Sequence, residues 1–182
     1  IGFSYGKYYL PLEYTSSTYM YVKNGDTSEE KTAINQQDLM ASKSLVETYI
    51  VILKNDTVVK QVGMSLVSKF GVSEISKCFT VKNGVISTSE LKDAISMSAD
   101  GDTEVLKISA QTKDPHVSAE ICDIYAEVAP TFLIRIIGAG SVEVIGDAEV
   151  PQSPSAPDVK KITMMAAAAG FVLSAGVAVL IY

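Results

Sequence analysis

The last 21 residues, 162–182, contain no charged side chain, and they constrain the chain more than any other segment. A helix of about 20 apolar residues crosses a bilayer core, so this stretch predicts a transmembrane helix. A buried core helix is the alternative, but it needs a shell of protein on all sides that the remaining residues scarcely supply. Gly170, Ser174 and Gly176 give the predicted helix a small-residue face, which permits close packing of a partner helix but is also common in single spans.

The first residues have the composition of a membrane edge. Aromatic side chains crowd around Lys7, as in the headgroup belt of a bilayer, namely Phe3, Tyr5, Tyr8, Tyr9 and Tyr14. Residues 1–11 are therefore predicted to be the end of, or exit from, an earlier span, with a tyrosine-rich strand as the alternative. Because position 1 is isoleucine, we expect the chain to be a fragment or a processed product.

Charge and cysteine content exclude several functions. The net charge is −6 and the basic residues are scattered, which argues against nucleic-acid binding. Cys78 and Cys122 cannot form a metal site alone. They are predicted to be buried thiols, or a disulfide if the domain lies outside the membrane.

The first half of the chain predicts a strand and two helices. Residues 12–22 are rich in β-branched and aromatic side chains and end at a turn sequence, 23–26. Apolar residues then recur every three or four positions between Asp38 and Lys54, as in an amphipathic helix. A second helix is expected from an Asp56 cap to Phe70, with Gly71 as its stop.

The second half predicts a hairpin, a long helix and a last strand. Residues 72–94 mix helical turns, a strand and an Asn83-Gly84 turn, and residues 95–99 and 104–111 alternate as a hairpin. Asp114 and Pro115 begin a helix that Pro130 is expected to bend before it continues to Ile137 and ends at 138–140. Residues 142–150 form the last predicted strand.

Three prolines at intervals of three, Pro151, Pro154 and Pro157, predict a stiff spacer with a polyproline II repeat in residues 151–161. The element order predicts an α+β fold, with a small mixed or antiparallel sheet covered by helices, membrane-proximal and followed by the C-terminal transmembrane helix. The domain itself is expected to span residues 12–150.

Catalytic, cofactor and metal sites are not predicted. His116 is the only histidine and lies in the first turn of a predicted helix, away from any nucleophile motif. Asp100, Asp102 and Glu104 have part of a calcium pattern, but a hairpin turn accounts for them. Residues 138–140 begin like a dinucleotide motif, which Glu143 breaks, and no P-loop occurs.

Arg135 is the only arginine, and it stands among apolar residues of a predicted helix. It is a candidate for a subunit boundary or a ring interior that contacts glycan, where a carboxylate or water would meet it. The alternative is an arginine that extends from a half-buried helix into solvent.

Three stretches together resemble the chain length determinant (Wzz-type) family of polysaccharide co-polymerases, which includes membrane activators of bacterial tyrosine kinases. They are YTSSTYMYV, then ISMSADGDTEVLKISAQTKDPHVSAEICDIYAEVAP, and finally VEVIGDAEVPQSPSAPDVKK before the predicted span. The length between the first and last resembles the compact version of Gram-positive capsule and exopolysaccharide systems.

The resemblance implies a multi-pass cell-membrane protein with two spans, both chain ends in the cytoplasm and the domain outside. It implies a ring of like subunits whose partners are a cytoplasmic tyrosine kinase and the polysaccharide polymerase or export machinery. Lys160 and Lys161 oppose this topology, because positive charge favours the cytoplasmic side.

The predicted function is therefore non-enzymatic: an oligomeric membrane scaffold that regulates the length, polymerisation or export of a surface polysaccharide. The alternative is a transmembrane sensor or activator whose main output is control of a cytoplasmic tyrosine kinase. An extracytoplasmic enzyme is a third hypothesis, which a nucleophile paired with a base would favour.

Overall fold

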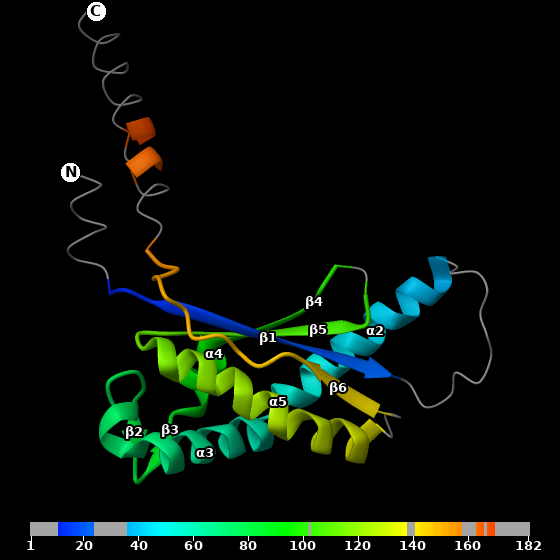
Figure 1. Cartoon of the computed structure of the whole chain (residues 1–182), viewed down its shortest axis with the longest axis horizontal. Coiled ribbons are helices and arrows are strands. Elements are labelled where there is room, and N and C mark those ends of the chain that lie inside the picture. The colour runs from blue at the N-terminus through cyan, green and yellow to red at the C-terminus, as the bar shows by residue number, and fades with distance from the viewer. Residues whose placement is uncertain are drawn as a thin grey trace, which may run out of the picture.

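The computed structural model describes residues 11–23, 36–101, 103–137, 141–157, 163–165 and 167–169. Its main feature is a four-stranded sheet in the order β4-β5-β1-β6, with helices against it (Figure 1). The strands are β1 (Tyr14–Lys23), β4 (Ile95–Ala99), β5 (Val105–Thr112) and β6 (Ser141–Ile145). The predicted α+β class is confirmed, and of the mixed or antiparallel alternatives every pairing in this sheet is antiparallel.

The two faces of the sheet differ because side chains alternate along each strand. The closed face carries apolar side chains that are at most 8% exposed, namely Met20, Val22, Ile95, Met97, Leu106, Ile108 and Ala110. The open face carries half-buried or exposed, mostly polar side chains, namely Thr15, Ser17, Tyr19, Tyr21, Ser96, Ser98, Lys107, Ser109 and Gln111. The predicted strand 12–22 and hairpin 95–111 are confirmed within a residue or two.

The helices form the other side of the core. Helix α5 (Pro115–Ile137) packs on β1 and β5, α2 (Gln36–Leu53) packs on β4, and α3 (Asp56–Ile75) packs against α5. The short α4 (Thr88–Ala94) lies between α3 and β4. Helix α5 continues through Pro130 to Ile137 as one helix, so the predicted continuation is confirmed, whereas the bend at Pro130 stays a prediction.

The observed N-cap residue is the predicted one in α5 and a different one in α3. The Asp114 carboxylate accepts a hydrogen bond from the His116 backbone N–H at 2.8 Å, as predicted for an N-cap. Asp56 does not cap α3. Asn55 is the extended residue before that helix, and its side chain accepts from the Thr57 N–H at 3.0 Å. The Asp56 carboxylate instead receives a hydrogen bond from the Lys92 ammonium.

Two glycines determine where α3 and the last strand are interrupted or end, and the pattern of apolar residues alone predicts different ends. Gly71 has φ 79° and ψ 159°, which breaks α3 as predicted, but one more helical turn follows to Ile75. The last strand ends at Ile145, not Val150, because Gly146 turns the chain away with φ 82°. The Asn83-Gly84 turn is confirmed and joins β2 (Val81–Lys82) to β3 (Val85–Ile86).

The predicted membrane segments fall almost wholly outside the described residues. Of residues 162–182, only 163–165 and 167–169 are described, and they are helical. Within the described ranges, no helix is both long and apolar enough to cross a bilayer. Of residues 1–11, only residue 11 is described.

Candidate functional site

The chain after β6 folds back along the first half of β1, and we call residues 146–157 the strap. Its contacts to β1 come mainly from side chains. Ser16 Oγ donates to the Glu149 carbonyl at 2.7 Å, and Thr18 Oγ1 donates to the Gly146 carbonyl at 3.1 Å. Farther along, the Asp123 carboxylate of α5 accepts from the Ala148 N–H at 2.8 Å. The strap is therefore held against both the sheet and α5.

The strap closes on the beginning of β1 through backbone bonds. The Glu13 N–H donates to the Ala156 carbonyl at 3.0 Å, and the Ser155 N–H donates to the Glu13 carbonyl at 2.8 Å. The hydroxyls of Thr15 and Ser155 lie 2.7 Å apart. The two ends of the domain consequently leave it side by side (Figure 1).

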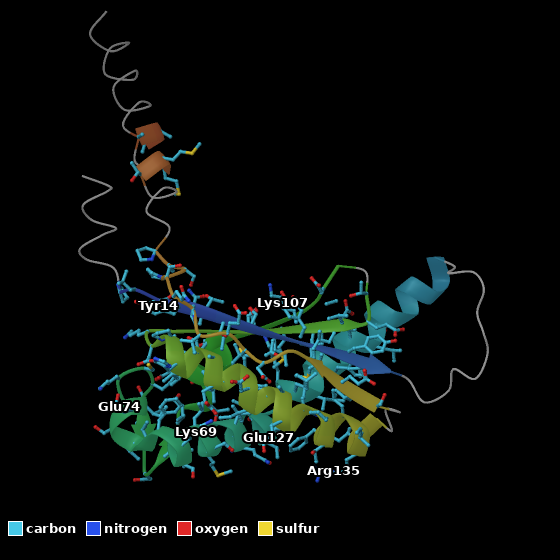
Figure 2. The ribbon with its side chains drawn as sticks, in the orientation of Figure 1. Tyr14, Lys69, Glu74, Lys107, Glu127 and Arg135 are labelled. Atoms are coloured by element: carbon cyan, nitrogen blue, oxygen red, sulfur yellow. The ribbon has the colours of Figure 1, made fainter. Side chains whose placement is uncertain are left out.

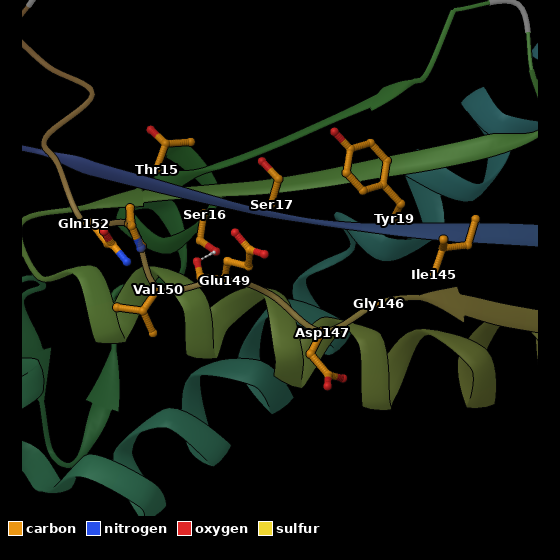
Figure 3. Close-up of a pocket in the computed structure, with 11 residues that line it drawn as sticks. Thr15, Ser16, Ser17, Tyr19, Ile145, Gly146, Asp147, Glu149, Val150 and Gln152 are labelled. Atoms are coloured by element: carbon orange, nitrogen blue, oxygen red, sulfur yellow. Dashed lines mark hydrogen bonds between the residues drawn. The ribbon is translucent and has the colours of Figure 1, made fainter.

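A groove of about 600 Å³ lies between β1 and the strap (Figure 3). It exists because β6 pairs with β1 only from Tyr19 to Lys23, which leaves the edge of β1 before Tyr19 without β6 as a neighbour. Its lining residues are Thr15, Ser16, Ser17, Tyr19, Ile145, Gly146, Asp147, Glu149, Val150, Pro151 and Gln152. The volume is in the range of small-molecule sites, although this groove is polar where such sites are mostly apolar.

The groove presents hydroxyls from one side and an acid from the other. Figure 3 shows the side chains of Thr15, Ser17 and Tyr19 on the open face of the sheet. It also shows the Glu149 carboxylate turned toward β1, whereas the Asp147 carboxylate points away from the strand. The eleven lining residues include two acids and no Lys, Arg or His.

Polar contacts continue from the groove across the open face. The hydroxyls of Ser17 and Ser109 lie 2.9 Å apart on paired strands. The Lys107 ammonium lies over the Tyr19 ring, 5.5 Å from its centroid, which is cation–π geometry. Burial, followed by the charge and hydrogen bond of Glu104, raises the pKa of the Tyr21 hydroxyl above its ordinary value, so this phenol stays neutral near pH 7.

Buried hydroxyls position α5 beneath β1. Ser118 Oγ lies 2.8 Å from Thr112 Oγ1 and donates to the Tyr14 carbonyl at 2.7 Å. One turn along α5, Cys122 Sγ lies 3.5 Å from the Ser16 carbonyl, and burial raises the pKa of this thiol to about 12. Cys122 and the half-buried Cys78 are both free thiols, so the predicted alternative of a disulfide is wrong.

Arg135 lies in the last turn of α5, and its side chain is exposed. Its guanidinium lies 4.9 Å from the centroid of the Phe132 ring. It borders a pocket of about 350 Å³ with mostly apolar walls, lined by Ile52, Asn55, Thr57, Val58, Phe132, Arg135 and Ile136. Ile134 and Ile136 beside it are 46% and 55% exposed. Figure 2 shows Arg135 at the end of the helical layer, on the side away from the open face of the sheet.

Among the described residues, the candidates for catalysis and metal binding do not lie close together. His116 is exposed at the start of α5. No cluster of three or more His, Cys, Asp or Glu side chains suited to a metal ion occurs in the part of the chain that the structure covers. Asp102 and the glycine motif at 138–140 lie outside the described residues.

The remaining predicted site residues belong to the strap and the segment after it. Pro151 lines the groove, Pro154 is exposed, and Pro157 follows Ala156, which pairs with Glu13. Gly170, Ser174 and Gly176 lie outside the described residues, so a small-residue face there stays a prediction. Sequence reasoning missed the groove, although all six residues of YTSSTY carry a hydroxyl, which was a signal for a polar sheet face.

Comparison with known proteins places the chain among capsule biosynthesis proteins. The family model described as "Chain length determinant protein" (Wzz) matches residues 1–66. The capsular polysaccharide biosynthesis protein CpsC of Streptococcus pneumoniae is 30% identical over 181 residues, which cover 100% of this chain and 71% of that protein.

Two further relatives carry similar names. CpsC of Streptococcus agalactiae is 26% identical over 180 residues, covering 99% of this chain and 69% of the relative. The probable capsular polysaccharide biosynthesis protein YwqC of Bacillus subtilis is 27% identical over 174 residues, covering 92% of this chain and 61% of its own length.

Proposed function

Because this chain belongs to the chain length determinant (Wzz-type) family of capsular polysaccharide biosynthesis proteins, we propose that it regulates polymer length, polymerisation or export without catalysing a reaction. In this proposal it acts as an oligomeric membrane scaffold. Many copies of the domain engage the growing polymer or its polymerase and so bias when elongation stops.

One observation supports the scaffold proposal most directly. The two ends of the domain are joined by the backbone bonds between Glu13 and residues 155–156, so the segments before and after the domain leave from one place. A domain tied at both ends to one membrane surface needs this arrangement. We propose that residues 1–11 leave a first span, that residues 151–161 are the spacer, and that residues 162–182 form a second span with the small face Gly170, Ser174 and Gly176.

We place a subunit contact at Arg135. An exposed guanidinium flanked by Ile134 and Ile136 offers a charge within apolar surface, which is the composition of many protein interfaces. It lies on the helical side of the molecule, away from the open face of the sheet, so a neighbour can dock there without covering that face (Figure 2).

The experiment compares Arg135→Ala with a matched loss of charge at the exposed Lys113, as Lys113→Ala, in the full-length membrane protein. Arg135→Ala is expected to shift the oligomer to smaller species on native gels and to change the polymer length made by cells. Wild-type assembly and wild-type polymer length for Arg135→Ala would remove the subunit contact.

The regulatory role itself is tested by deleting the gene. A change in the length distribution of the surface polymer supports the scaffold proposal. Normal polymer length together with reduced phosphorylation of a cytoplasmic tyrosine kinase would support the kinase-activator alternative instead.

A further inference from the structure

We propose that the groove between β1 and the strap binds a segment of uncharged polysaccharide directly. The inference rests on the proposed function, because it makes the polymer a direct ligand of a named site. It goes beyond that function, which holds equally well if the domain touches only protein partners.

The groove matches the hydrogen-bonding chemistry of a sugar. Every sugar hydroxyl both donates and accepts, and the hydroxyls of Thr15, Ser17 and Tyr19 do the same. The Glu149 carboxylate is turned toward β1 from the strap and accepts charge-assisted hydrogen bonds, which are stronger than neutral ones (Figure 3). Gln152 adds an amide that donates and accepts. Tyr19 also supplies an aromatic ring beside its polar tip.

The charge of the groove selects an uncharged polymer. Its lining residues carry Asp147 and Glu149 and no cation, so a uronic acid or phosphate would meet like charge. Lys107 on the open face lies nearby, but its ammonium is held over the Tyr19 ring. The ligand class that fits is therefore a neutral glycan.

The construction of the groove disfavours a protein strand as the occupant. A strand that paired with the free edge of β1 would need the space beside Ser16 and Thr18. Their hydroxyls already cross that space to the carbonyls of Glu149 and Gly146. A ligand must lie above these two bonds, against side chains instead of backbone. The lining is also poorer in large apolar residues than the core of a protein interface.

The test measures saturation-transfer NMR and affinity for the full-length protein in lipid nanodiscs. The probe is the surface polysaccharide of the source strain after chemical reduction of its carboxyl groups, which removes the charge of its uronic acids and gives a neutral polymer when the polymer carries no phosphate. Oligomers of polygalacturonate are the anionic comparison. The wild-type protein is expected to bind the neutral probe at least tenfold more tightly than the anionic one.

Matched substitutions locate the site. Glu149→Gln is expected to weaken binding about tenfold, as for one lost charge-assisted bond, and Tyr19→Phe several-fold. Glu127→Gln removes the same charge from an exposed position on α5, outside the groove, and should bind like wild type. Ser98→Ala removes an open-face hydroxyl outside the groove and should also leave binding unchanged.

Each contrary outcome has a defined meaning. No saturation transfer to the wild-type protein, or equal losses for Glu149→Gln and Glu127→Gln, would overturn the groove as the site. Tighter binding of polygalacturonate would overturn the neutral class. Loss of self-association in Glu149→Gln with glycan binding intact would make the groove a contact between copies. These failures leave the proposed function standing, which fails only if gene deletion leaves polymer length normal.

Discussion

The closed and open faces of the sheet are built from the same strands, yet they have opposite compositions. On β5, Leu106 and Ile108 are fully buried toward the helices, whereas Lys107 and Ser109 between them face outward. Burial of the closed face therefore supplies the free energy that stabilises the fold. The open face and its groove contribute little to stability, so their hydroxyls are free to serve recognition.

The largest expected effect is on the closed face. Leu106→Ala removes a fully buried side chain and leaves a cavity, so it should lower the free energy of unfolding by about 2–5 kcal/mol. Ser98→Ala on the open face should change it by less than about 0.5 kcal/mol. Urea denaturation of both variants measures the difference, and equal losses would abolish the distinction between the two faces.

The pH dependence of stability is a second test of the closed face. The pKa of Cys122 is raised from 9.0 to about 12, so above pH 9 the unfolded chain loses a proton that the folded chain keeps. The stability from this thiol is complete below pH 9 and is lost as the pH rises toward 12. Wild-type protein should thus lose stability between pH 9 and 11 more steeply than Cys122→Ala. Identical slopes for the two proteins would show that burial does not perturb this thiol.

A smaller effect is expected where a hydroxyl is buried under the sheet. Ser118→Ala leaves the Thr112 N–H, which donates to Ser118 Oγ at 3.1 Å, without its acceptor. The expected loss is about 1–3 kcal/mol, against almost none for the exposed Ser96→Ala. Thermal unfolding of the two variants tests whether the loss of stability depends on the face from which the hydroxyl is removed. An unchanged stability for Ser118→Ala would mean that water replaces the hydroxyl.

The smallest effect is expected at the surface of the helical layer. Lys69 Nζ donates to Glu120 Oε1 at 2.6 Å, but the lysine side chain is 63% exposed. Solvent and salt screen such a pair, so Lys69→Met should leave the unfolding midpoint unchanged within error. A clear drop in the midpoint that disappears in high salt would show that this ion pair supports the packing of α3 on α5.

Local patterns predicted most elements because each has a local physical cause. Composition and a following turn placed β1, and alternation placed β4 and β5. The Asn83-Gly84 pair placed a turn, and Asp114 placed the start of α5. The Asn55 cap was missed because Asn and Asp stand together and both suit the position. The end of β6 depends on the backbone of Gly146, which the apolar residue Val150 obscured.

The groove depends on contacts that sequence spacing cannot show. Ser16 and Glu149 are 133 residues apart, and their contact requires β6 to stop pairing at Tyr19 while the strap continues beside β1. A run of hydroxyl side chains in β1 indicates a polar face, but not which segment lies opposite. The strap itself was predicted only as a spacer, because the spacing of its prolines does not predict the pairing of Ala156 with Glu13.

The most direct measurement is the length distribution of the surface polymer in cells that carry one of two matched double variants at equal protein level. Tyr19→Phe with Glu149→Gln removes a hydroxyl and a charge from the groove. Ser98→Ala with Glu127→Gln removes a hydroxyl and a charge from positions outside the groove. We predict that only the first shifts the length distribution, with both thermal midpoints unchanged. A wild-type distribution for the first variant at normal abundance would contradict a functional role for the groove.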